Sequence, residues 1–236
     1  MTLLTARGVR RSWRRQRRRG YLVPIVIAVA MATGAVWLVG YLLWPTFQDT
    51  ASTPQRIPVS IGGTVFNVPE RAFRIKVQKH SGPQERVDLA YSYPSLLPPE
   101  PRKHVTADEV EDGRQPIDRI FVSIATPGAA LPPDVRVNTI YPRYLEPAAA
   151  PAQDGLTVRP FREASPYVGE DLYTGAAPPL VARCTREGDT PGMCLSERRV
   201  EGADLTFRFP RQWLVAWRDV AGAIDQLTAQ LHRPRG

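Results

Sequence analysis

Two cysteines, Cys184 and Cys194, are the residues of this sequence best suited to covalent chemistry. They bracket residues 185–193, a segment dense in turn-forming residues, and each adjoins a short apolar run. This spacing predicts a hairpin closed by a disulfide, which forms and persists in an oxidising compartment. In the chain-entropy model, closing so short a loop contributes about 2.5–3 kcal/mol. Two free thiols and a redox-active pair are the alternatives, although redox pairs usually lie two residues apart.

A metal site is the second chemistry to consider, because His104 precedes a run of acidic residues. The acidic residues are Asp108, Glu109, Glu111 and Asp112. They lack the alternating ligand spacing and the central glycine of a calcium-binding loop. We therefore expect a solvated loop here, and no metal ion or other cofactor.

Motifs for nucleophilic catalysis are absent from the sequence, which has no Gly-x-Ser-x-Gly and no Ser-x-x-Lys. Carboxylate pairs such as Glu170 and Asp171 occur in any domain of this size and do not indicate a hydrolase. Gly62 and Gly63 predict a hairpin turn rather than a phosphate site, because no lysine-bearing helix start follows them. The sequence therefore favours a protein without enzymatic activity.

The N-terminal part of the chain carries a strong topological signal. Residues 1–20 contain no Asp or Glu, and residues 21–44 contain no charged residue. At about 1.5 Å per residue, a helix over 21–44 reaches about 36 Å, enough to cross a hydrocarbon core of about 30 Å. Arginines before this span and none just after it favour a cytoplasmic N-terminus. These arginines are Arg7, Arg10, Arg11, Arg14, Arg15, Arg17, Arg18 and Arg19.

Three other targeting signals compete with a single-pass signal-anchor. A cleaved signal peptide has an apolar region of about 7–15 residues, whereas this chain stays apolar through Trp44. Arg10 and Arg11 resemble a twin-arginine signal, but the residues that follow do not continue it. A mitochondrial presequence is also rich in arginine, but an uninterrupted span directly after it is unusual.

The formal net charge of +8 and the pI near 9.9 resemble those of a nucleic-acid-binding protein. The excess lies in residues 1–20, because the rest of the chain has equal numbers of basic and acidic residues. We therefore expect this Arg-rich tail to contact anionic lipid, and we expect no nucleic-acid partner. Arginine far outnumbers lysine, which is typical of a GC-rich bacterial genome and makes the periplasm the expected outer compartment.

The rest of the sequence predicts a linker at 45–56 and an extracytoplasmic domain at 57–236. The proline-rich residues 94–116 predict a long loop. Apolar residues at 133–146 have helical spacing, although Pro142 interrupts it. Residues 147–154 are a candidate boundary within the domain. The expected strands are 59–61 and 64–68 as a hairpin, 87–93 with one buried face, 117–125 with two buried faces, and a meander of 155–161, 167–173, 180–184, 194–200 and 205–209.

A C-terminal helix is expected from Pro210 to Leu231. Trp213 and Trp217 are interpreted as core residues of this helix, and a partner-binding face is the alternative, since tryptophan is common at interface hot spots. The apolar stripe that makes the helix amphipathic is Leu214, Trp217, Ala221, Ile224 and Leu231.

Together these patterns predict an α+β protein: one N-terminal transmembrane helix, then a mainly antiparallel β extracytoplasmic domain with a C-terminal amphipathic helix. We expect a single-pass protein of the bacterial inner membrane whose periplasmic domain is a non-enzymatic structural or interaction subunit, including inhibitors of the immunity type. Its expected partners are the lipid bilayer and an envelope protein. A tethered ligand-binding or sensing domain, or an unrecognised hydrolase, is the alternative, with its pocket along the 94–116 loop.

Overall fold

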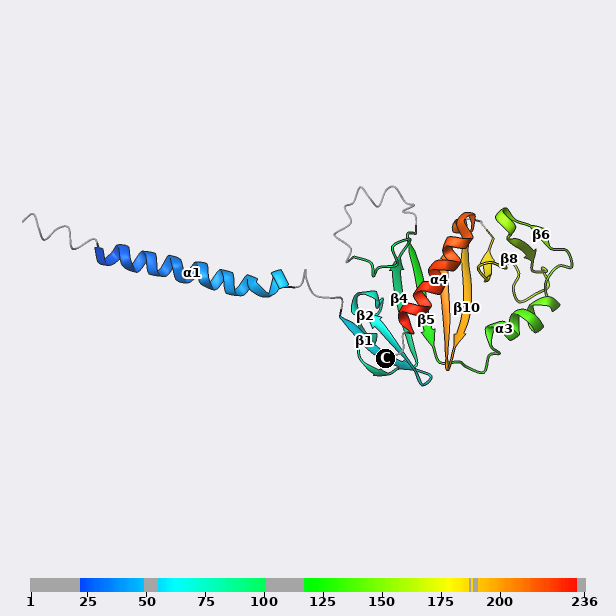
Figure 1. Cartoon of the computed structure of the whole chain (residues 1–236), viewed down its shortest axis with the longest axis horizontal. Helices are drawn as coiled ribbons and strands as arrows, with labels where there is room; N and C mark the ends of the chain where they lie inside the picture. Colours follow the sequence, from blue (N-terminus) through cyan, green and yellow to red (C-terminus); the bar gives the residue numbers. More distant parts are fainter. Residues whose placement is uncertain (1–21, 49–54, 101–116, 187, 189–190, 233–236) are drawn as a thin grey trace, which may run out of the picture. The chain divides into compact units, whose positions relative to one another are not determined.

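The computed structural model describes residues 22–48, 55–100, 117–186, 188 and 191–232. The chain forms two compact units, Met1–Thr53 and Pro54–Gly236 (Figure 1). The described part of the first unit is one helix, α1 (Leu22–Gln48). Across the described residues, no helix is both long enough and apolar enough to cross a membrane. The Arg-rich tail and Tyr21 lie outside the described residues.

An eight-stranded antiparallel sheet forms most of the second unit, in the order β4-β5-β11-β10-β9-β8-β7-β6. The predicted C-terminal meander is confirmed, because strands β7 to β11 each pair with the next along the chain. The pairing of β5 with β11 then extends the meander with the earlier strands. The strands are β4 (Arg86–Ser92), β5 (Arg119–Ala125), β6 (Ala150–Pro151), β7 (Thr157–Pro160), β8 (Glu170–Gly175), β9 (Leu180–Thr185), β10 (Met193–Val200) and β11 (Ala203–Pro210).

A small second sheet has the order β2-β1-β3 and contains the predicted hairpin. Gly62 and Gly63 form its turn with positive φ, a conformation that glycine adopts without steric cost. This turn touches the β10–β11 turn so closely that a Cβ atom on Gly62 would lie 1.7 Å from the carbonyl oxygen of Gly202. The Gly202 amide donates a hydrogen bond of 3.1 Å to Thr64 Oγ1, which ties the two sheets together. The strands are β1 (Arg56–Ile61), β2 (Thr64–Pro69) and β3 (Gly82–Pro83).

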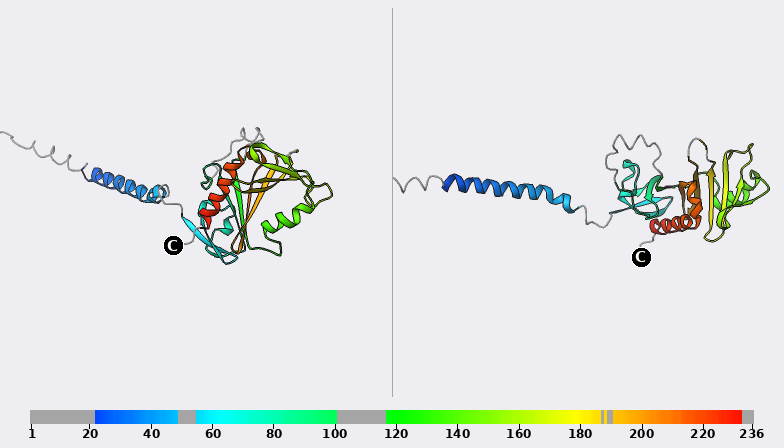
Figure 2. Two further views of the ribbon diagram at one scale, coloured as in Figure 1. Left: turned by 45° about the vertical axis from the view of Figure 1, so that its right-hand side comes forward. Right: turned by 90° about the horizontal axis from the view of Figure 1, so that it is seen from above.

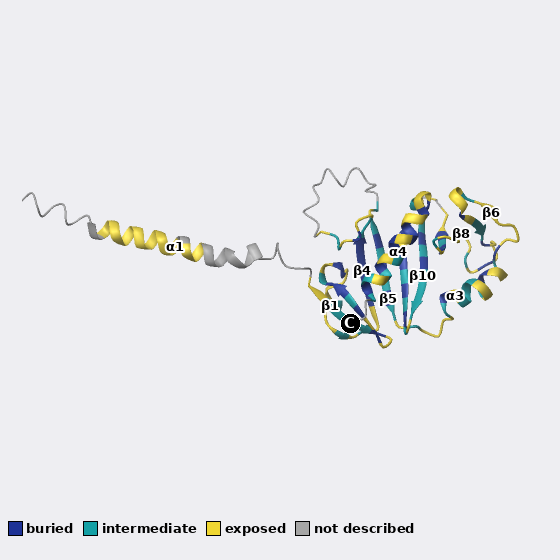
Figure 3. Ribbon diagram, in the orientation of Figure 1, coloured by how far each residue is buried: buried dark blue, intermediate teal, exposed yellow. Residues whose placement is uncertain are grey.

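The C-terminal helix begins as a 3-10 helix, Arg211–Ala216, and continues as α4 (Trp217–Leu231). Its predicted apolar stripe is buried, with every member at most 3% exposed. Figures 1 and 2 show α4 lying across the eight-stranded sheet, and it also contacts β2. The main core therefore lies between this face of the sheet, α4 and the small sheet, and the outward side of α4 is exposed (Figure 3).

Two strand predictions were wrong about burial. In β4, Asp88 and Ala90 are buried as well as the alternating apolar residues, because residues 70–78, with two short 3-10 helices (Glu70–Ala72 and Lys76–Gln78), run beside the strand. The Arg74 amide there donates a 2.9 Å hydrogen bond to the Asp88 carbonyl oxygen. In β5, one face is buried and the other is half-exposed, with Phe121 covered in part by the Arg74 guanidinium.

Residues 133–143, hereafter the side helix, resolve the ambiguous segment of the sequence as helical. They run through α3 (Pro133–Val135), a π-helical turn (Arg136–Ile140) and a 3-10 turn (Tyr141–Arg143). Pro142 is tolerated because it lies in the first turn of the 3-10 helix, where its missing N–H costs little. A last short 3-10 helix, Gln153–Gly155, precedes β7.

The side helix packs on the sheet face opposite α4. On β8, Tyr173 belongs to the main core while Leu172 joins a second apolar cluster with the side helix. On β9, Ala182 and Val181 divide in the same way. Since successive side chains of a strand point to opposite faces, α4 and the side helix cover different sides of the sheet.

Candidate binding groove

A groove with a volume of about 680 Å³ lies between the side helix and strands β8, β9 and β10. This volume falls within the range of about 300–1,000 Å³ that is usual for binding pockets. On β10, Leu195 and Glu197 face the groove, whereas Cys194 and Ser196, which alternate with them, are buried. The apolar lining consists of Pro133, Val137, Tyr141, Leu172, Val181 and Leu195.

An aromatic cluster fixes the side helix to the sheet below the groove. The Tyr141 ring meets the Phe161 ring edge-on at 5.5 Å and the Tyr167 ring at 5.2 Å between centroids. Tyr141, Phe161 and Leu172 are each at most 4% exposed. The walls of the groove are therefore held in place by packing.

Arg183 lies at the edge of this aromatic cluster. Its Nε is 2.7 Å from Glu170 Oε2, and its guanidinium lies 4.8 Å from the centroid of the Tyr167 ring. Burial raises the pKa of Glu170 above its ordinary value, although Arg183 opposes this effect. Burial likewise raises the pKa of Tyr141, so its hydroxyl stays neutral near neutral pH. Arg183 is thus occupied by a carboxylate and a ring.

The other arginines along the groove are paired as well. Arg136 Nη2 lies 3.0 Å from Glu197 Oε2; burial lowers the pKa of Arg136, and Glu197 outweighs this and raises it. Arg199 donates two hydrogen bonds to the Asp204 carboxylate, of 2.6 and 2.9 Å. Arg198 forms an ion pair with Asp225 of α4.

Asp134 is different from these carboxylates. It lines the groove in an exposed position and, among the residues that the structure describes, forms no ion pair. The hydrogen bond to Asp204 is the largest cause of the raised pKa of Arg199, and the charge of Asp134 also contributes to raising it. The carboxylate of Asp134 is therefore an acidic group at the rim of the groove that is accessible to solvent.

The groove offers chemistry for recognition. Its described lining contains no histidine, cysteine, serine, threonine or lysine, and its acidic groups are Asp134 at the rim and Glu197, which is paired with Arg136. The described ranges of the chain also contain no group of three His, Cys, Asp or Glu residues placed to hold a metal ion. What remains is an apolar floor surrounded, in the described lining, by paired charges and by the one unpaired carboxylate of Asp134.

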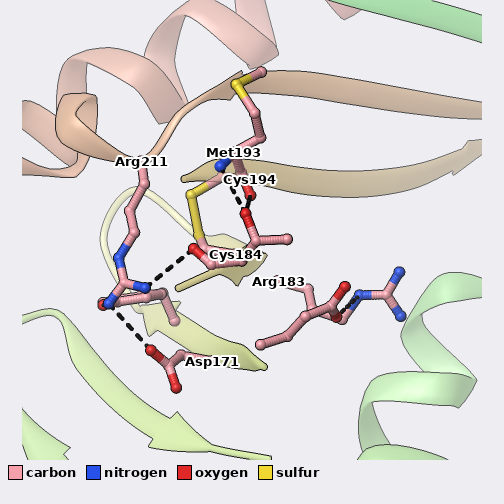
Figure 4. The surroundings of a disulfide bond; sticks show 9 residues. Asp171, Arg183, Cys184, Met193, Cys194 and Arg211 are labelled. Carbon is pink, nitrogen blue, oxygen red and sulfur yellow. Dashed lines mark hydrogen bonds and ion pairs between the residues drawn. A yellow bond between two sulfur atoms is a disulfide. The ribbon is translucent and has the colours of Figure 1, made fainter. Parts of the chain in front are cut away.

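A disulfide joins Cys184 and Cys194, which lie opposite each other on β9 and β10 (Figure 4). Both cysteines are buried. Beside them, Arg211 lies 3.1 Å from Asp171 and donates a 2.6 Å hydrogen bond to Tyr173 Oη. The bridge fixes the register of β9 and β10, which carry Val181, Arg183 and Leu195 into the groove, and the ion pair holds β8 to the start of the C-terminal helix.

The two tryptophans singled out from the sequence lie away from the groove. Trp217 is 1% exposed, its Nε1 donates a 3.2 Å hydrogen bond to the Asp154 carbonyl oxygen, and its ring covers Gly175. It is a core residue and presents no surface to a partner. Trp213 is half-buried and stacks on Tyr93 with 4.2 Å between ring centroids.

Other predicted site residues fall outside the described residues. These are His104 with the acidic residues at 108–112, and the arginines of the tail. The groove residues, in turn, were missed by sequence reasoning. The helical spacing of Val137, Ile140 and Tyr141 did indicate an apolar face at 133–146, but the strands that meet this face come from 30 or more residues further along the chain.

No family model matches this sequence, and no curated protein matches it. The fold is similar to that of Smlt3025, an immunity protein of the Stenotrophomonas maltophilia type IV secretion system, with a TM-score of 0.52 and 15% identity over 78% of this chain and 95% of that one. It also aligns with FrpD, an iron-regulated outer membrane lipoprotein of Neisseria meningitidis, with a TM-score of 0.43 and 12% identity over 76% and 93%. At 15% identity, the likeness to Smlt3025 shows a shared fold alone.

Proposed function

We propose that this protein is a membrane-anchored binding protein of the bacterial envelope whose second unit binds another protein in the groove and catalyses no reaction. The observation that carries this proposal is the groove itself. Its walls are fixed by packed aromatic rings, its floor is apolar, and its arginines already have carboxylate partners. Such a surface is preorganised for binding.

The anchor is proposed from the sequence alone. Residues 21–44 are uncharged and follow eight arginines, which supports a single inner-membrane span with a cytoplasmic tail and a periplasmic second unit. Tyr21 and several side chains of α1 lie outside the described residues, and no membrane span is found among those that are described. Carbonate extraction of membranes and alkaline phosphatase fused after Gly236 test this part. Extraction of the protein, or an inactive fusion, would reject it.

Photocrosslinking in cells tests the binding function. A photoreactive amino acid replaces Asn138, which lines the groove, or Thr139, which is its exposed neighbour outside the lining. The two positions are matched, since each side chain donates one hydrogen bond to a backbone carbonyl of the same segment. We expect one discrete protein adduct from position 138 and none from 139. Equal labelling at both positions, or no adduct at 138, contradicts the proposal.

An immunity-type role is the finer form of this proposal. It is supported by the shared fold with Smlt3025, which extends over 95% of that immunity protein. If the role is correct, cells that lack this protein lose in mixed culture against the parent strain, and a plasmid copy restores their survival. Equal survival of the deletion strain in contact with the parent counts against immunity, while the binding function would stand.

A further inference from the structure

The charges around the groove nearly cancel, with an excess of one carboxylate. Three arginines on this side of the sheet line or border it and face four acidic residues, since Arg198 pairs with Asp225 of α4 on the opposite face. The arginines are Arg136, Arg183 and Arg199, and the acidic residues are Asp134, Glu170, Glu197 and Asp204. Each arginine is taken by one carboxylate, so the excess negative charge resides at Asp134.

An anionic ligand would find no free cation among the described residues that line this groove. To bind one, Arg183 or Arg199 would have to give up its present carboxylate, and breaking a half-buried pair leaves an uncompensated charge. A cationic group needs no such exchange, because Asp134 is exposed and has no ion pair in the described structure. Charge complementarity therefore favours a basic group at this end.

The rest of the lining favours apolar side chains. Val137 of the side helix and Val181 and Leu195 of the strands are each only half-buried, so an occupant could cover them further. Covering apolar surface contributes about 25 cal/mol per Å². The groove is open to solvent between the side helix and the strands, so a segment of a partner chain can enter it from outside.

We propose that the groove takes a segment of the partner protein that places a basic side chain beside Asp134 and apolar side chains on Val137, Val181 and Leu195. This inference rests on the proposed function and names the chemistry of the partner at the same site. The acidic group gives the segment its direction and specificity, while the apolar contacts supply most of the affinity.

Peptide selection on the full-length protein in detergent tests the inference. Phage-displayed random peptides are selected against the wild-type protein, and the best peptide is synthesised for measurement of Kd. We expect selected peptides with Lys or Arg next to apolar residues. Peptides that are mainly acidic, or no selected peptide at all, would overturn the inference.

Substitutions then locate the basic contact. Asp134→Asn should weaken binding about fivefold at low salt and less at high salt, as for an exposed ion pair, and Asp134→Lys should weaken it further. Asp134→Glu should retain most of the affinity. Asp219→Asn is the matched control, because Asp219 is likewise an exposed acid in the first turn of a helix, α4, away from the groove lining. Equal effects of Asp134→Asn and Asp219→Asn overturn the inference.

The two proposals can fail separately. If position 138 crosslinks to a protein but Asp134→Asn binds as well as wild type, the partner chemistry is wrong and the binding function stands. If position 138 gives no adduct and no peptide is selected, the binding function itself is wrong.

Discussion

The two faces of the eight-stranded sheet carry different kinds of side chain: one is mainly apolar, and the other combines polar, charged and aromatic residues. The face under α4 is a continuous apolar core that includes Trp217, Phe207 and Ile224, all at most 1% exposed. The opposite face carries ion pairs, a small aromatic cluster and the groove near β8–β10, and a polar network around Asp88 near β4 and β5. The difference teaches that packing under α4 supplies most of the stability, so the other face is free to carry recognition groups.

Trp217→Ala should have the largest effect on stability. The change empties a large volume under α4 and removes the hydrogen bond to Asp154, which should cost about 3–5 kcal/mol of unfolding free energy. Urea denaturation of the full-length protein in detergent, followed by circular dichroism, measures it. Val215→Ala is the control, because Val215 is 72% exposed and its loss should change stability by less than about 0.5 kcal/mol. Equal costs for the two variants would contradict the assignment of the core to this face.

Replacing both cysteines by alanine should come next. Without the closed loop between Cys184 and Cys194, the unfolded state gains entropy, and stability should fall by about 2.5–3 kcal/mol. A reducing agent should lower the stability of the wild type in the same denaturation assay and leave the double variant unchanged. A response of the double variant to reductant would show that the effect lies elsewhere.

Asp88→Asn tests the polar network on the second face. Burial raises the pKa of Asp88, but hydrogen bonds from Arg86, Ser123 and Gln78 outweigh it and lower the pKa below its ordinary value. The carboxylate therefore stabilises the fold above the unfolded pKa, and this contribution is lost as the pH falls through the lower folded pKa. We expect a loss of about 1–2 kcal/mol near neutral pH, measured by urea denaturation.

The same variant should lose its effect in acid. Once Asp88 is protonated in the wild type, the free energies of unfolding of the two proteins should converge. A difference that stays constant from about pH 7 to about pH 2 would assign the loss to packing instead of charge.

Apart from the control at Val215, Leu195→Ala should have the smallest effect on stability. Leu195 is half-exposed on the groove floor, so its truncation should cost less than about 1 kcal/mol, well below Trp217→Ala. The yield of the crosslinked adduct from a photoreactive group at position 138 should nevertheless fall. A large loss of stability with unchanged crosslinking would reverse the roles given to the two faces.

Several features of the fold could be predicted because they depend on local chemistry. Period-two apolar patterns and glycine turns specified the β1–β2 hairpin and the strands of the C-terminal meander. The i, i+3 and i, i+7 stripe specified a helix with one buried face. Cysteine spacing across a turn predicted the disulfide-closed hairpin that the structure contains.

Tertiary structure alone decided where the groove lies and what it contains. The sequence offered Val137 and Tyr141 as an apolar helical face, but did not say that Val181 and Leu195 would meet it. It also gave no sign that Asp88 would be buried by residues 70–78, or that Glu170 would pair with Arg183. Side-chain periodicity sets which face of a strand is apolar. Pairing between residues distant in the chain depends instead on how the helices and strands pack together, and no local pattern in the sequence indicates this packing.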